Sequence, residues 1–250
     1  MNDIPRIIAH RGASVAAPEN SISALQRAWM EGADGVECDV RLTSDCQVVC
    51  IHDADTERVA ERNLSVEAHT YEELAQLDVG LKKSANFKGE RIPLLSEWLA
   101  NVHAGKKVLI ELKTGAEILV PLFEVLDAAS VALKQIVLIT FDLEMVRALK
   151  AQRPGLGVYW LIDVKSNWLG RSKLKLADVL DTVVDTNVDG IGLRCHSGIN
   201  REMVKAILEA DIDLNIWTVD DPVDARRYAS FGVSSITTNC PEVIRYALQK

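Results

Sequence analysis

Charged and titratable residues follow short apolar runs at four places in the chain. The runs lead into His10-Arg11, Glu37 with Asp39, His52-Asp53, and Glu111 with Lys113. Histidine exchanges protons near neutral pH, and carboxylate oxygens are the ligands that hard divalent cations prefer. These residue types predict acid–base chemistry beside a metal ion.

Two of these groups show a spacing of two residues. Glu37 and Asp39 share GVECDV, and Glu111 and Lys113 share IELKT. Residues two apart in a strand point to one face, so three carboxylates and one ammonium would gather there. Their net charge of -2 favours a divalent cation with oxygen ligands, Mg²⁺ or Ca²⁺, over zinc. The alternatives are ordinary ion pairs, with Arg41 for the first two carboxylates and between Glu111 and Lys113.

Apolar segments that alternate with amphipathic ones must position these residues. The predicted strands are Arg6–Ala9, Gly35–Leu42, Val48–Ile51, Lys107–Leu112, Gln135–Thr140, Gly157–Ile162, Gly190–Leu193, Asp213–Val219 and Ser235–Thr238. The predicted helices are Ser21–Glu31, Leu95–Val102, Ile118–Ala129, Leu143–Ala151, Leu176–Val183, Arg201–Glu209, Asp221–Phe231 and Pro241–Gln249. Strands and helices alternating over 250 residues predict an α/β fold, a (β/α)₈ TIM barrel. A doubly wound open sheet is the alternative, disfavoured because no Gly-rich dinucleotide turn occurs.

One polar stretch interrupts the alternation, from Ala54 to about Arg91. It is too long for an ordinary loop between a strand and a helix. We therefore predict a single catalytic barrel over residues 1–250, with a small insertion at about 54–91 after the second strand region, over one mouth of the barrel. Functional residues of such barrels lie at the carboxyl ends of the strands, where Trp217 of IWTVDD is expected as well. Core packing is the alternative role of Trp217.

The composition disfavours nucleic acids and membranes as partners. A net charge of -8 at pH 7 disfavours nucleic acid and stable membrane association, and no apolar stretch approaches the roughly 20 residues that span a bilayer. The five cysteines are odd in number and lack CxxC spacing, which predicts reduced, mostly buried thiols. Since no apolar leader is apparent either, we expect a cytoplasmic protein.

Five short motifs occur in a distinctive order. They are HRG at 10–12, PENS at 18–21, GVECDV at 35–40, IHD at 51–53 and ELK at 111–113. In order and spacing they resemble the glycerophosphodiester phosphodiesterase family, its bacterial cytoplasmic branch most closely, and later segments such as TFD at 140–142 extend the resemblance over nearly the whole chain. TERVAERNLS at 56–65 departs from the family because it lacks the usual glycines, which leaves the leaving-group preference open.

The resemblance implies a fold, an activity and a set of site residues. The expected fold is a (β/α)₈ barrel, and the expected reaction is metal-dependent hydrolysis of small glycerophosphodiesters to sn-glycerol 3-phosphate and an alcohol. The matching positions are metal ligands Glu37, Asp39 and Glu111, acid–base histidines His10 and His52, phosphate contacts Arg11 and Lys113, and the glycerol contact Trp217. We assign His10 as general base and His52 as general acid, with water or the glycerol 2-hydroxyl as nucleophile.

Several alternatives stay open. A barrel directed at lipid phosphodiesters would need an apolar rim or a basic patch, and a non-catalytic barrel would bind glycerophosphodiesters without cleaving them. Asn20 either caps the first helix or joins the site, and Glu19 either orients Arg11 or is incidental. The sequence leaves the oligomeric state open, and a homo-oligomer is compatible with it.

Overall fold

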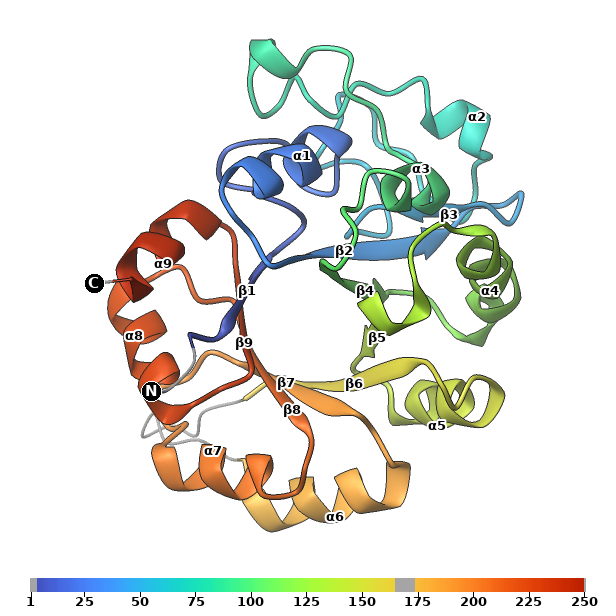
Figure 1. Cartoon of the computed structure of the whole chain (residues 1–250). Helices are drawn as coiled ribbons and strands as arrows, with labels where there is room; N and C mark the ends of the chain where they lie inside the picture. The colour runs from blue at the N-terminus through green and yellow to red at the C-terminus, as the bar shows by residue number, and fades with distance from the viewer. Residues whose placement is uncertain (1–3, 165–173, 250) are drawn as a thin grey trace.

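The computed structural model describes residues 4–164 and 174–249. Within these residues, eight parallel strands form a closed barrel in the order β1-β9-β8-β7-β6-β5-β4-β2, closed by pairing of β1 with β2 (Figure 1). Their bounds are β1 (Arg6–Ala9), β2 (Gly35–Leu42), β4 (Lys107–Leu112), β5 (Ile136–Thr140), β6 (Gly157–Ile162), β7 (Gly190–Arg194), β8 (Asp213–Trp217) and β9 (Ser235–Thr238). The predicted (β/α)₈ barrel is confirmed, and the open sheet is wrong.

Helices surround the strands on the outside of the barrel (Figure 1). They are α1 (Ile22–Met30), α3 (Leu95–Leu99), α4 (Leu119–Ala128), α5 (Leu143–Gln152), α6 (Leu176–Thr186), α7 (Arg201–Leu208), α8 (Pro222–Phe231) and α9 (Pro241–Leu248). Two short 3₁₀ turns, η2 (Ala116–Ile118) and η3 (Leu133–Gln135), precede α4 and β5. Side-chain caps start several of these helices: Ser21 accepts from the backbone of α1, and Asp221 from that of α8.

The side chains of the barrel strands alternate between two cores. On β2, Val36, Cys38 and Val40 pack outward into the large core between strands and helices. The intervening Glu37 and Asp39 take the other face, toward the barrel interior. Apolar side chains of the other barrel strands fill the rest of the interior and form a second, smaller cluster: Ile8, Leu109, Val137, Ile139, Tyr159 and Leu161. The charged residues therefore share the barrel interior with an apolar core.

One predicted strand does not belong to the barrel. β3 (Val48–Cys50) pairs antiparallel with β2, so the two strands form a hairpin. The apolar run VVCI has the composition of a barrel strand, but a short connection after β2 permits only an antiparallel return, since a parallel strand needs a long crossover. The hairpin brings the chain back to Asp39, whose carbonyl accepts from Ile51 N at 3.0 Å. His52 therefore reaches the site from a hairpin.

The polar segment 54–91 lies outside the ring of helices, beside α1 and α3 (Figure 1). It holds α2 (Tyr71–Leu74) and the turn η1 (Ala85–Phe87). A separate apolar cluster joins this segment to the hairpin and comprises Val49, Ile51, Ala60, Val66, Leu74, Leu77, Val79 and Ile92. We call residues 54–91 the inserted segment.

Two further expectations concern the surface and the thiols. None of the helices in the described residues has the length and apolar character needed to span a membrane. All five cysteines are free, but only Cys38 and Cys50 are buried, so the expectation of mostly buried thiols is wrong. Cys46 is exposed because it lies in the polar turn of the β2–β3 hairpin, where it adopts a left-handed φ of 61°.

Candidate active site

A cavity of about 230 Å³ opens at the carboxyl ends of the barrel strands. Seven of the eight predicted site residues line it: His10, Arg11, Glu37, His52, Glu111, Lys113 and Trp217. The eighth, Asp39, is fully buried and contacts two of these seven. Barrel closure thus brings together residues that lie up to 207 positions apart in the sequence.

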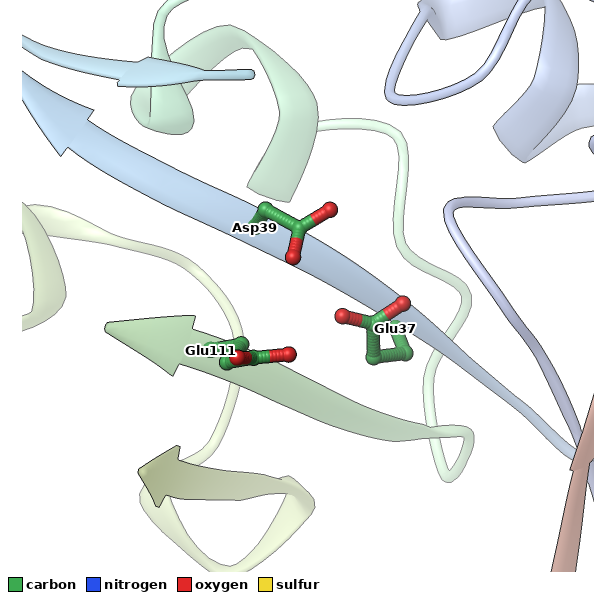
Figure 2. A group of neighbouring side chains, drawn as sticks. All are labelled: Glu37, Asp39 and Glu111. Carbon is green, nitrogen blue, oxygen red and sulfur yellow. The ribbon is translucent and has the colours of Figure 1, made fainter. Parts of the chain in front are cut away.

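Three carboxylates form the centre of the site. Glu37 and Asp39 on β2 and Glu111 on β4 are exposed by only 2%, 0% and 7%, and one oxygen of each lies within 4.8 Å of the others. Figure 2 shows the three groups turned toward a common space. The Oε1 atom of Glu37 is buried and has no hydrogen-bond partner among the described residues. An all-oxygen set with an unpartnered buried carboxylate oxygen fits a hard divalent cation.

Two cations compensate part of this charge. Arg11 Nε lies 3.0 Å from Asp39 Oδ2, and Lys113 Nζ lies 3.2 Å from Asp39 Oδ1. Lys113 also pairs with Glu111, so the ion pair foreseen as an alternative exists within the site. Arg41 pairs with none of the three carboxylates and instead donates to the carbonyls of His52 and Lys113, at 2.9 and 3.3 Å.

The crowding of carboxylates changes their proton affinities. Burial, reinforced by the charge of Asp39, raises the pKa of Glu37 to about 8 and that of Glu111 to about 7. Burial also opposes ionisation of Asp39, but Arg11 and Lys113 hold its pKa below the usual value. Asp39 is therefore the permanent anion of the group, and the other two retain protons more firmly than exposed glutamates do.

His10 is held by an amide. Its Nδ1 lies 2.7 Å from Asn239 Oδ1, which also accepts from Ser14 Oγ at 2.8 Å. Asn239 Nδ2 donates to Asp220 Oδ2 at 2.6 Å, and this contact fixes the amide orientation because a carboxylate only accepts. Nδ1 of His10 therefore carries the proton, and Nε2 is left on the side of Glu37, 3.9 Å from its Oε2. Burial and the Arg11 cation lower the pKa of His10.

His52 is held by a carboxylate instead. Its Nδ1 lies 2.7 Å from Asp53 Oδ1, and Asp53 Oδ2 accepts from Arg58 Nε at 2.6 Å. Burial lowers the pKa of His52, against the charge of Asp39 and the bond to Asp53. The two histidines thus differ in their partners: one faces a neutral amide, the other an anion that stabilises a charged ring.

Of the two roles that the sequence leaves open for Asn20, the structure shows the direct contact with the site. Asn20 Nδ2 donates to Asp39 Oδ2 at 2.9 Å, and Asn20 Oδ1 accepts from Asp39 N at 3.1 Å. The residue is buried and has a left-handed φ of 57°, while the neighbouring Ser21 supplies the cap of α1. Asparagine tolerates this backbone conformation better than most residues, so its side chain can hold the most buried carboxylate.

We expect Asn20→Ala to lower the free energy of unfolding by about 2–3 kcal/mol, because it removes the acceptor of the buried Asp39 N and one of the two donors to Asp39 Oδ2, which then keeps only Arg11 Nε. Asn187→Ala is the matched control: Asn187 also has a left-handed φ, of 51°, but it is exposed at the end of α6. It should cost about 1 kcal/mol, from backbone strain alone. Equilibrium urea unfolding measures both, and equal losses would contradict a role of Asn20 in holding Asp39.

Apolar side chains form one wall of the cavity. Ile139, Phe141 and Leu161 line it beside Trp217, and the rings of Phe141 and Trp217 meet edge to face with centroids 5.6 Å apart. Sequence reasoning did not single out Phe141 as a site residue, although it lies in the TFD motif. It also missed Asn239, because the contact of Asn239 with His10 joins residues 229 positions apart.

Comparisons with known proteins identify the family of this chain. The model of the glycerophosphoryl diester phosphodiesterase family matches residues 10–243. YhdW of Bacillus subtilis is 32% identical over 95% of this chain and 96% of its own length. The glycerophosphodiester phosphodiesterase of Caldanaerobacter subterraneus is 31% identical over 98% of both chains.

Solved structures share the fold. A phosphodiesterase of Oleispira antarctica, determined with its product sn-glycerol-3-phosphate, superposes with a TM-score of 0.86 at 24% identity, covering 99% of this chain and 98% of that one. The resemblance inferred from the motifs is confirmed by the family model, which spans His10 and every other predicted site residue. The chain belongs to the glycerophosphoryl diester phosphodiesterase family of hydrolytic enzymes.

Proposed function

We propose that this protein hydrolyses small glycerophosphodiesters to sn-glycerol 3-phosphate and an alcohol, with the aid of a divalent metal ion. The observation that carries the proposal is a cavity lined by two histidines, two cations and the carboxylates of Glu37 and Glu111, with the buried carboxylate of Asp39 grouped beside these two. The product held by the Oleispira antarctica phosphodiesterase supports the choice of substrate class. Mg²⁺ and Ca²⁺ both suit the oxygen ligands of Glu37, Asp39 and Glu111.

The charged residues bind and polarise the phosphodiester. When bound, Mg²⁺ or Ca²⁺ supplies Lewis-acid polarisation of a phosphoryl oxygen. Arg11 and Lys113 donate hydrogen bonds to the non-bridging oxygens, and these bonds strengthen as negative charge develops in the transition state. Both side chains are already held by Asp39, so their orientation costs little when substrate binds.

The histidines move the two protons of the reaction. His10 accepts a proton through Nε2, because Nδ1–H is bound to Asn239, and so activates water or the glycerol 2-hydroxyl for attack on phosphorus. His52 donates a proton to the departing alcohol oxygen, and its hydrogen bond to Asp53 offsets part of the lowering of its pKa by burial. If the 2-hydroxyl attacks, water then opens the cyclic phosphate. Either route adds one water across the P–O bond.

The apolar wall orients the glycerol end. Trp217 and Phe141 present ring surfaces to the cavity, and carbon-bound hydrogens of glycerol can pack against them while the charged residues take the phosphate. Separate contacts for the glycerol carbons and for the phosphate explain why two aromatic rings lie beside the charged residues of the cavity.

The direct test is product release. Purified protein with Mg²⁺ or Ca²⁺ should release sn-glycerol 3-phosphate from glycerophosphoethanolamine, measured by a coupled dehydrogenase assay. Binding without release would indicate a non-catalytic barrel. A higher turnover on a micellar lysophospholipid would indicate a lipid-directed enzyme instead.

Asn239 offers a test of the general base. Asn239→Ala removes the acceptor that orients His10, and we expect kcat for glycerophosphoethanolamine to fall about 10- to 100-fold with little change in KM. Ser14→Ala is the control, because Ser14 Oγ binds the same Asn239 oxygen without contacting His10. If Asn239→Ala has the same turnover as the control, the hydrogen bond from His10 Nδ1 to Asn239 is not needed for His10 to act as the general base.

A further inference from the structure

The guanidinium of Arg58, in the inserted segment, binds two carboxylates that each contact a residue of the site. Arg58 lies in a turn of that segment, and its Nη1 and Nη2 donate to Glu19 Oε2 and Oε1 at 2.5 and 2.8 Å. Its third donor, Nε, reaches Asp53 Oδ2 at 2.6 Å. A planar fork with several fixed donors can serve two carboxylates at once, which the single ammonium of lysine cannot do in the same geometry.

Each of these carboxylates holds a residue of the cavity. Glu19 Oε1 also accepts from Arg11 Nη1 at 2.9 Å, and Asp53 Oδ1 contacts His52 Nδ1 at 2.7 Å. Arg11 comes from the loop after β1, and His52 follows the β2–β3 hairpin. Arg58 is therefore the shared partner of a residue expected to bind phosphate and a residue expected to protonate the leaving group.

The exposure of Arg58 indicates whether its ion pairs act mainly on the stability of the fold or on the positions of site residues. Its side chain is 47% exposed, and ion pairs this accessible contribute little to the stability of a fold. Catalysis is more sensitive, because a displacement of about 1 Å of a reacting group can cost about 10²-fold in rate. An exposed arginine that pairs with the partners of two site residues is thus expected to matter more for turnover than for folding.

We propose that Arg58 is a positioning residue that sets the separation of Arg11 and His52, so that the inserted segment takes part in catalysis through this one side chain. This inference rests on the proposed hydrolysis of glycerophosphodiesters. It gives the inserted segment a function in the site although the segment lies outside the ring of helices, and it places a requirement for arginine in the stretch that departs from the family pattern.

Leaving-group dependence tests the proposal. With glycerophosphoethanolamine the departing alkoxide needs a proton, whereas the p-nitrophenyl ester of glycerol 3-phosphate releases a stable phenolate. We expect Arg58→Ala to lower kcat for glycerophosphoethanolamine about 10- to 100-fold, and to lower kcat for the p-nitrophenyl ester less. Arg58→Lys should show the same loss, because a single ammonium cannot serve both carboxylates in this geometry. Free guanidinium should restore part of the rate of Arg58→Ala, because Arg58 borders an open cleft of about 140 Å³.

Three further variants distinguish the effect of Arg58 from that of its neighbours. Arg62→Ala removes another exposed arginine of the same segment and should behave as wild type. Asp53→Asn should reproduce the leaving-group dependence, and Glu19→Gln should lower both rates equally through Arg11. These two variants also decide the question if Arg58→Ala does not fold: the proposal then stands only if both patterns are seen.

The outcomes that overturn the proposal are distinct. Arg58→Ala with wild-type rates on both esters would show that the bridge is dispensable. Equal losses on both esters without guanidinium rescue would show a merely structural role. If the wild-type protein releases sn-glycerol 3-phosphate from neither ester, the proposed function fails, which is a different result from an active wild type that does not need Arg58.

Discussion

Replacing His52 by alanine should lower kcat for glycerophosphoethanolamine about 10³-fold and leave the p-nitrophenyl ester of glycerol 3-phosphate within about tenfold of wild type. The physical reason is that only the alkoxide leaving group needs the proton of His52. His52 is bound to Asp53 and lines the cavity, so this proton is available at the mouth of the site.

His10→Ala is the complementary experiment. A general base is needed for either leaving group, so both esters should lose about 10³-fold. Steady-state kinetics on the two esters measures both variants, with circular dichroism to confirm their folding. If instead His10→Ala spares the nitrophenyl ester and His52→Ala does not, the two roles are exchanged. Either variant retaining more than a few per cent of both wild-type rates would exclude that histidine from proton transfer.

Removal of divalent metal should abolish turnover. A cation bound by the three carboxylates would supply several kcal/mol to the transition state, so exhaustive chelation should lower kcat at least about 10³-fold, and Mg²⁺ or Ca²⁺ should restore it. Full activity after chelation would remove Glu37, Asp39 and Glu111 from the mechanism as metal ligands.

Thermal unfolding gives a second readout that does not depend on activity. Cation at about 100 times its Kd stabilises the folded state by about 2.7 kcal/mol, which corresponds to a rise in Tm of about 5–10 °C for a chain of this size. Glu37→Gln and Glu111→Gln should lose this rise, because each removes one charged ligand. Glu124→Gln, at an exposed position on α4, should retain it. An undiminished rise in both glutamine variants would place the ion elsewhere.

Much of the fold and of the charged centre was predictable because it depends on local patterns. Strands buried on both faces read as apolar runs, and their alternation with helices identified the barrel. The two-residue spacing of Glu37 with Asp39, and of Glu111 with Lys113, placed these side chains on one face, since strand geometry alone determines that. The structure brings them into one cavity or directly behind it.

Other features depend on contacts between distant segments. The apolar run of β3 is compatible with a barrel strand, and only the short connection after β2 makes it antiparallel. Arg58 and Glu19 are 39 residues apart and belong to different loops, so no periodicity in the sequence links them.

The sequence by itself determined which residues are available for chemistry and which face of each strand they occupy. The tertiary structure decided how the two histidines are held. His10 receives Asn239 because β1 and β9 are neighbours in the closed barrel, although their residues lie at opposite ends of the chain. Side-chain alternation is a property of a single strand, whereas hydrogen-bond partners across the barrel exist only once the sheet has closed on itself.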